Sequence, residues 1–258
     1  MSQGKLAFVV AGAQKSGTCT LDAILRLHPQ IQMASVKETH FFDDEEREWK
    51  SSDYSGIDKY FTGRDDRLRG EATPITMYWR PAVRRLHHYN PDLRILIILR
   101  NPVVRAFSQW RHEYSQGRET MPFGEAIRGG RCRVRSQGTT EGLHRVFSYV
   151  ERGLYGDQLC FLSRYFPKTN IHCEIYEEFF DYRSAGLERI ANFLGIKPFP
   201  AEIPDIRLNP SLAIAYPSTL SREDIIYLSG LFHHQIEEVE KFLARQVPSW
   251  RAQVREAV

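Results

Sequence analysis

The sequence predicts an α/β protein in which a central, mostly parallel sheet carries helices on both faces. Residues 5–11 and 93–99 are continuous apolar runs, which are typical of strands that are buried on both sides. Helical patterns lie between the predicted strands, so strand and helix alternate along the chain. The 258 residues contain neither internal repeats nor low-complexity tracts, and we therefore expect a single domain over residues 1–258.

Capping residues, prolines and glycines indicate where the remaining helices and strands begin and end. After the first strand come a polar turn and a helix over residues 21–27, which His28-Pro29 ends. Asn101 and Ser221 are favoured N-caps for helices that begin directly after them, and Gly195 is suited to end the helix at 184–194. We expect further strands at 31–34 and 170–176 and further helices at 57–61, 78–89, 142–152, 155–166 and 222–243. Residues 43–70 otherwise indicate a loop, 70–74 a tight connection and 118–141 a mobile segment.

The bulk composition excludes several classes of protein. A formal net charge of +3 gives no general nucleic-acid footprint. No Cys-x-x-Cys pair or zinc-type histidine spacing occurs, so we expect no metal site. The four cysteines are expected to be free thiols, including Cys160 and Cys173. No stretch has the length of a signal sequence or membrane span, and we expect a cytoplasmic protein with no transmembrane segment.

A cluster of arginines stands in one glycine-containing segment. Its members are Arg128, Arg131, Arg133 and Arg135. One interpretation is a solvated loop, and the other is an edge that attracts an anionic cofactor or substrate.

The polar turn after the first strand has the features of an anion site. The stretch Gln14–Leu21 joins a predicted strand to a predicted helix, so free backbone N–H groups and the positive end of the helix dipole meet there. Lys15 adds a mobile positive charge, and Ser16, Thr18 and Thr20 add hydroxyl donors. The order differs from the Walker phosphate loop, because the glycine follows the lysine and Val10 stands where a glycine is required.

A second candidate anion element follows the most hydrophobic strand. Arg100 comes directly after residues 93–99, and parallel strands end at one edge of a sheet, where ligands bind. Ser108 lies on the next helix, roughly 9 Å along its axis from Pro102. Each residue alone is more simply explained as a surface ion pair or a helix flank. Together they could hold a second phosphate.

Four ordered motifs resemble those of the sulfotransferases. Gln14–Leu21 resembles their 5′-phosphosulfate-binding loop, and Arg100–Trp110 resembles their 3′-phosphate element, with arginine and serine eight residues apart. Lys37–Asp43 (Lys-Glu-Thr-His-Phe-Phe-Asp) and Gly70–Pro74 (Gly-Glu-Ala-Thr-Pro) look like the branch that contains the heparan sulfate N- and 3-O-sulfotransferases and their bacterial relatives. Gly153-Leu154-Tyr155 and Phe193-Leu194-Gly195 also fit this branch, and the similarity spans roughly residues 5–196.

The resemblance implies a P-loop-NTPase-like sulfotransferase fold and a defined donor, 3′-phosphoadenosine 5′-phosphosulfate (PAPS), which leaves as 3′-phosphoadenosine 5′-phosphate (PAP). It implies that Lys15 neutralises the charge on the oxygen that joins sulfur to the 5′-phosphate as the S–O bond breaks. It also implies that Arg100 and Ser108 bind the 3′-phosphate. The 5′-phosphate would be bound at Ser16 and at the backbone N–H groups of Gly17, Thr18, Cys19 and Thr20. Tyr155 could face the adenine or be a packed aromatic residue.

The same resemblance implies that Glu38 is the base that accepts the proton of the acceptor hydroxyl. The alternative for Glu38 is an ion pair with Lys37 or a nearby arginine. His40 is the competing candidate for the base. Several eukaryotic members have a lysine where this chain has Ala72, and that charge is absent here or comes from elsewhere, such as Arg80. Arg207 and Asn209 are candidates for a loop that closes over the nucleotide.

We therefore expect a bacterial-type sulfotransferase that acts on a hydroxyl of a carbohydrate, glycolipid or small metabolite. The alternatives are a kinase-like enzyme that uses ATP and a non-catalytic nucleotide-binding scaffold. The sequence indicates neither the acceptor nor the oligomeric state. Acceptor contacts are expected from residues 43–69 and 115–145.

Overall fold

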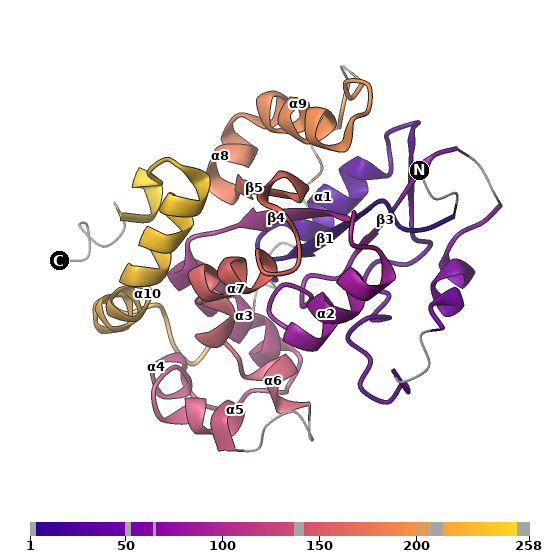
Figure 1. Ribbon diagram of the computed structural model, residues 1–258. Coiled ribbons are helices and arrows are strands. Elements are labelled where there is room, and N and C mark those ends of the chain that lie inside the picture. Colours follow the sequence, from indigo (N-terminus) through magenta and orange to yellow (C-terminus); the bar gives the residue numbers. More distant parts are fainter. Residues whose placement is uncertain are drawn as a thin grey trace. The chain divides into compact units, whose positions relative to one another are not determined.

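The computed structural model describes residues 4–49, 53–63, 66–136, 142–200, 202–204, 206 and 214–251, with Arg135 and Ser136 described by their backbone alone (Figure 1). Contacts divide the chain into two compact units. The first comprises Met1–Leu99 and Cys160–Asn209, and the second comprises Arg100–Leu159 and Pro210–Val258. The single domain over residues 1–258 stays a prediction.

The first unit is built on a parallel sheet of five strands in the order β2-β3-β1-β4-β5. The strands are β1 (Phe8–Gly12), β2 (Ile31–Met33), β3 (Leu68–Ala72), β4 (Arg94–Leu99) and β5 (Ile171–Ile175). Every neighbouring pair runs parallel. The predicted α/β fold with a parallel sheet is confirmed, and β1 and β4 coincide with the two apolar runs.

Helices cover both faces of this sheet. Those of the first unit are α1 (Thr18–Leu25), α2 (Arg80–Tyr89), α8 (Tyr176–Asp181) and α9 (Arg183–Leu194), with 3-10 turns η1 (Ser55–Tyr60) and η4 (Lys168–Asn170). Phe8 and Val10 of β1 pack with Leu21 of α1 and Ile190 of α9 in one buried cluster. Since alternate strand residues share a face, this cluster fills one side of the sheet. α2 lies on the opposite side (Figure 1).

The strand β3 corrects the prediction of a loop and a tight connection around residues 43–74. Its sequence Leu-Arg-Gly-Glu-Ala lacks the apolar run that reveals a central strand. Arg69 is nonetheless buried, and its guanidinium donates to the backbone oxygens of Gly4 and Gly63. Gly70 leaves room for the Phe8 ring of the neighbouring strand. Tertiary partners therefore stabilise a strand that the sequence pattern conceals.

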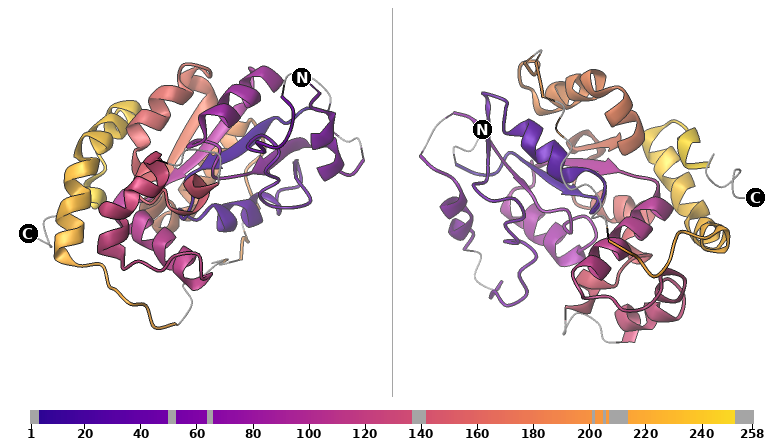
Figure 2. Two further views of the ribbon diagram at one scale, coloured as in Figure 1. Left: turned by 90° about the horizontal axis from the view of Figure 1, so that it is seen from below. Right: turned by 180° about the vertical axis from the view of Figure 1, so that it is seen from behind.

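The second unit is mainly helical. It contains α3 (Pro102–Ser115), α4 (Phe123–Ala126), η2 (Gly129–Arg131), α5 (Cys132–Ser136), α6 (Leu143–Val146), η3 (Glu151–Gly153), the first residues of α7 (Tyr155–Leu162) and α10 (Arg222–Leu243). α10 packs against α3 (Figure 2). The two predicted caps are confirmed: Asn101 Oδ1 accepts from Val103 N at 3.0 Å, and Ser221 Oγ accepts from Asp224 N at 3.1 Å.

The prediction of a mobile segment at 118–141 is wrong for its described part, residues 118–136, which fold into short helices. Trp110 of α3 explains this order, because its indole is fully buried and donates from Nε1 to the backbone oxygen of Met121 at 2.9 Å. Phe123 packs edge-on against the same indole. The four cysteines, all within the described residues, are thiols that form no disulfide bond. Within the described residues, no helix combines the length and apolar character needed to cross a bilayer.

Gly70→Ala tests the packing of β3 against β1. A Cβ at this position would lie 2.2 Å from Phe8 Cζ, so the ring or the strand must move. We expect the free energy of unfolding to fall by about 1–3 kcal/mol, measured by urea denaturation.

The matched control is Gly230→Ala on the exposed side of α10, where an added Cβ meets no atom within 4 Å. Alanine favours helix over glycine, so the control should gain about 0.5–1 kcal/mol. Equal behaviour of the two variants would contradict the packing described for β3.

Candidate active site

The turn after β1 is held against the sheet by its own backbone. Ala13 N donates to Ile98 O of β4 at 2.8 Å, and Ser16 N donates to Ala13 O at 3.2 Å. Lys15 has φ of 67° and Gly17 has φ of 83°, both in the left-handed region. Gly17 is the N-cap of α1, and a side chain there would also collide with Phe180, whose ring lies 2.8 Å from an added Cβ. The turn therefore requires this glycine.

The N-terminus of α1 has features that favour an anion. No side chain caps this helix, and no acidic residue stands in its first turn. The first N–H groups of a helix have no partner within it, so they and the helix dipole favour an anion here. Ser16 is fully buried, and its Oγ has no hydrogen-bond partner among the described residues. A buried hydroxyl without a partner is costly, and it fits a site that a phosphate completes.

The segment Lys37–Asp43 follows β2 and is tied to β3. Glu38 N donates to Ala72 O at 2.9 Å. Glu38 and His40 have φ of 60° and 50°. Since side chains alternate along an extended chain, the left-handed backbone at Glu38 is what allows adjacent Lys37 and Glu38 to meet in an ion pair.

Left-handed backbone is concentrated in these two segments. Four described non-glycine residues have positive φ. Three of them are Lys15, Glu38 and His40, and the fourth, Ala244, is the C-cap of α10. Such conformations cost free energy and cluster at functional sites. The backbone thus singles out the three residues that the sequence predicts as catalytic.

His40 connects Glu38 with a buried carboxylate. Its Nε2 lies 3.6 Å from Glu38 Oε2, and its Nδ1 lies 2.9 Å from Asp43 Oδ2. Asp43 is 1% exposed, whereas the His40 side chain is about half exposed. Glu38 therefore forms the ion pair with Lys37 that was its alternative role. It also lies beside His40, the competing candidate for the base.

Glu71 on β3 is a buried carboxyl group that the sequence analysis did not single out. Its Oε2 accepts from Thr73 Oγ1 at 2.6 Å and from Thr39 Oγ1 at 3.2 Å, whereas its Oε1 is buried with no partner among the described residues. Burial, with a smaller contribution from the nearby Asp43, raises the pKa of Glu71 to about 7, although the hydrogen bonds from the two threonine hydroxyls lower it. The sequence contained a signal for this site, since the motifs Lys37–Asp43 and Gly70–Pro74 each combine a glutamate with a threonine.

Lys37 joins the two segments. Its ammonium pairs with Glu38 Oε1 and also hydrogen-bonds Cys19 on the first turn of α1. Burial disfavours the charge, but the Glu38 carboxylate and the Cys19 sulfur outweigh burial, so the pKa of Lys37 is raised. The structure therefore brings the predicted base and the predicted anion turn together within the first unit.

Arg100, Ser108 and Tyr155 belong to the second unit. Arg100 follows β4 directly and Ser108 lies on α3, both half-buried. Tyr155 is 1% exposed, donates from its hydroxyl to Arg100 O at 3.0 Å, and packs with Trp250 at a centroid distance of 6.0 Å. This geometry agrees with the packed-aromatic alternative for Tyr155. Arg207 and Asn209 lie outside the described residues.

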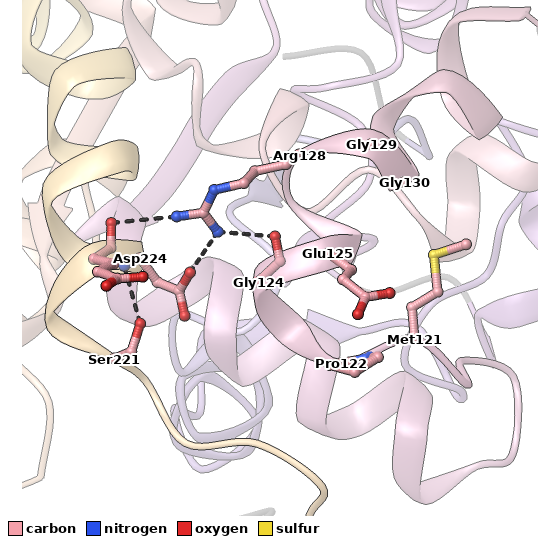
Figure 3. A pocket seen from close by; sticks show the side chains of 10 residues that line it. Met121, Pro122, Gly124, Glu125, Arg128, Gly129, Gly130, Ser221 and Asp224 are labelled. Atoms are coloured by element: carbon pink, nitrogen blue, oxygen red, sulfur yellow. Dashed lines mark hydrogen bonds and ion pairs between the residues drawn. The ribbon is translucent and has the colours of Figure 1, made fainter.

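The arginine cluster is largely neutralised within the second unit. Arg128 pairs with Asp224 at 2.5 Å beside a hollow of about 590 Å³ between α4 and the start of α10 (Figure 3). Arg131 pairs with Glu151 at 2.9 Å, and Arg133 pairs with Glu119 at 2.7 Å. These ion pairs stabilise the short helices, which removes the main argument for an anion-attracting edge. In the described part of the chain, no three His, Cys, Asp or Glu side chains are grouped to hold a metal.

Comparison with known proteins agrees with this geometry. The family model for the sulfotransferase domain matches residues 6–216. The chain belongs to the sulfotransferase domain family. This family assignment and the fold predicted from the resemblance are confirmed.

Two mammalian relatives and two solved structures illustrate the similarity. Heparan sulfate glucosamine 3-O-sulfotransferase 6 from Mus musculus is 31% identical over 195 residues, which is 73% of this chain and 52% of the relative. Its Homo sapiens counterpart is 31% identical over 192 residues, with the same shares. The chain thus spans about half the length of these curated relatives.

The crystal structure of a sulfotransferase from Alicyclobacillus acidocaldarius matches with a TM-score of 0.78 at 26% identity and covers 96% of this chain and 99% of that chain. The sulfotransferase domain from the curacin biosynthetic pathway, at 13% identity and a TM-score of 0.52 over 90% of this chain and 99% of that domain, shares the fold.

Glu71→Gln tests whether the buried carboxyl is protonated in the folded protein. Folded Glu71 keeps its proton up to about pH 7, whereas the unfolded chain releases it near 4.5, so this group lowers stability as pH rises between those values. Glutamine mimics the protonated acid. The free energy of unfolding of the variant relative to wild type should therefore rise by up to about 3 kcal/mol between pH 4.5 and 8 in urea titrations.

Glu46→Gln, at an exposed carboxylate, is the control and should show no such rise. A Glu71→Gln difference that stays constant across the same pH range would mean that Glu71 is ionised in the fold.

Proposed function

We propose that this protein transfers a sulfuryl group from PAPS to a hydroxyl of an acceptor molecule. The observation that carries the proposal is the contact of Lys37 with both Cys19 and Glu38, because it connects a carboxylate with the turn at the start of α1. Membership of the sulfotransferase domain family supports the same reaction.

The turn before α1 and the segment Lys37–Asp43 have separate roles in the proposed reaction. The N–H groups at the start of α1 and the Ser16 hydroxyl bind the 5′-phosphate. Lys15 neutralises the negative charge that develops on the bridging oxygen as the S–O bond breaks. Glu38 accepts the proton from the attacking hydroxyl on the opposite side of sulfur, with His40 as the competing base. As in phosphoryl transfer, positioning and charge stabilisation supply most of the catalysis.

Arg100 and Ser108 of the second unit are proposed to bind the 3′-phosphate, which distinguishes PAPS from ATP. Arginine is suited to this task because its planar guanidinium forms paired hydrogen bonds with phosphate. Tyr155, which donates to the Arg100 carbonyl, is proposed to support this element.

The acceptor is proposed to be a hydroxylated carbohydrate, glycolipid or small metabolite. The matched relatives are named as heparan sulfate glucosamine 3-O-sulfotransferases, which favours a glycan hydroxyl. The ion-paired arginines on α5 and η2 offer no additional support for an anionic acceptor.

The function is tested with purified protein, sulfur-35-labelled PAPS and a panel of hydroxylated glycans and metabolites, together with calorimetry of PAP and ATP. We expect micromolar-range PAP binding and labelled product with at least one acceptor. Absence of PAP binding would contradict the proposal, and a preference for ATP would indicate a kinase-like enzyme. Binding of PAPS without transfer or slow hydrolysis would indicate a non-catalytic scaffold.

Ser16→Ala tests the anion turn. Because the hydroxyl has no partner in the described structure, its removal should leave the melting temperature unchanged or slightly higher. Loss of one hydrogen bond to a charged phosphate should weaken PAP binding about 10-fold in calorimetry. Unchanged PAP affinity would exclude Ser16 from the site.

Glu38→Gln tests the base. The variant should bind PAP as wild type does, because the base contacts the acceptor and not the product nucleotide. Turnover should fall by about 10²- to 10⁴-fold. Glu188→Gln is the control at an exposed carboxylate of α9. If Glu38→Gln keeps its turnover and His40→Ala loses it, His40 is the base.

A further inference from the structure

The ammonium of Lys37 lies between the two segments that the proposed reaction uses. It pairs with Glu38 Oε1 and hydrogen-bonds Cys19, which is the second residue of α1. Its side chain is only 19% exposed. A lysine that served solubility alone would extend into water, so this partly buried contact requires another explanation.

The position of Lys37 can be related to the proposed roles of its two neighbours, the N-terminus of α1 and Glu38. The N-terminus of α1 binds the phosphate to which the sulfuryl group is attached. Glu38 must reach the acceptor hydroxyl, which attacks sulfur from the side opposite the bridging oxygen. In the proposed reaction, a group that touches both Cys19 and Glu38 would therefore face the sulfuryl group during its transfer.

The positive charge of the Lys37 ammonium suits a position beside the sulfuryl group. The raised pKa keeps its ammonium protonated throughout the neutral range. When Glu38 accepts a proton from the acceptor, the carboxylate loses its charge and its attraction for Lys37. The ammonium is then attracted by the nearest remaining negative charge, which is on the sulfuryl oxygens.

We propose that Lys37 is a second catalytic cation, which orients Glu38 before the reaction and contacts the sulfuryl oxygens during transfer. The inference rests on the proposed function. In the step itself, the acceptor oxygen forms a bond to sulfur, and the bond between sulfur and the bridging oxygen breaks. The electron pair of that bond stays on the 5′-phosphate beside Lys15, and the acceptor proton goes to Glu38.

The proposal separates two nucleotides that differ only in the sulfuryl group. Lys15 and Ser16 contact the phosphate that PAP and PAPS share, whereas Lys37 contacts only what PAPS adds. Lys37→Met keeps the length of the side chain and removes the charge. We expect its affinity for PAP to stay within about threefold of wild type, while its affinity for PAPS falls about 10-fold. The kcat should fall by about 10²- to 10³-fold.

Matched variants complete the experiment. Lys197→Met, at an exposed lysine shortly after α9, should change none of these quantities. Lys37→Arg, which keeps the charge, should recover part of the PAPS affinity, and Lys37→Gln provides a second neutral variant if methionine impairs folding. Binding is measured by calorimetry and folding by thermal unfolding, so the conclusion does not depend on turnover alone.

The outcomes are distinct. Selective loss of PAPS affinity in the neutral variants supports the role of Lys37. Equal loss of PAP and PAPS affinity, or no change in either, overturns it, because Lys37 would then support the turn or have no part in binding. Wild-type protein that binds neither nucleotide contradicts the proposed function instead.

Discussion

Parallel pairing of β1 between β3 and β4 is the constraint on which the candidate site depends. Phe8 and Val10 are completely buried, so the strand that precedes the anion turn cannot shift without disrupting the core. The hydrogen bond from Ala13 N to Ile98 O extends this pairing into the turn, and the one from Glu38 N to Ala72 O attaches the proposed base to β3. Three adjacent strands thus determine where the proposed reacting groups lie.

The stable sheet carries backbone that is unfavourable on its own. Lys15, Glu38 and His40 adopt left-handed conformations, each at a cost of about 1–3 kcal/mol. Buried carboxyl groups at Asp43 and Glu71 add a desolvation cost. Both kinds of cost occur together in the segments at and after the ends of β1, β2 and β3. This distribution is expected where a scaffold holds reactive groups ready for chemistry.

Sequence patterns predicted the parts of the fold whose signal is local. The apolar runs at β1 and β4, the Asn101 and Ser221 caps and Gly195 after α9 depend on neighbouring residues alone. β3 was missed because its polar residues are buried by partners distant in sequence. In the site, Glu38 and Lys15 came from motif order, whereas Glu71 and Lys37 became visible only when folding brought Thr39 and Cys19 to them.

Each compact unit is assembled from two separate stretches of chain, and this has a consequence for synthesis. β4 ends at Leu99, but its neighbour β5 begins only at Ile171. At about 5–20 residues per second, the ribosome needs roughly 4–14 s to deliver that neighbour. During this interval the nascent sheet presents an open apolar edge at the strand next to β1. Such an edge is a template for pairing with other chains until β5 covers it.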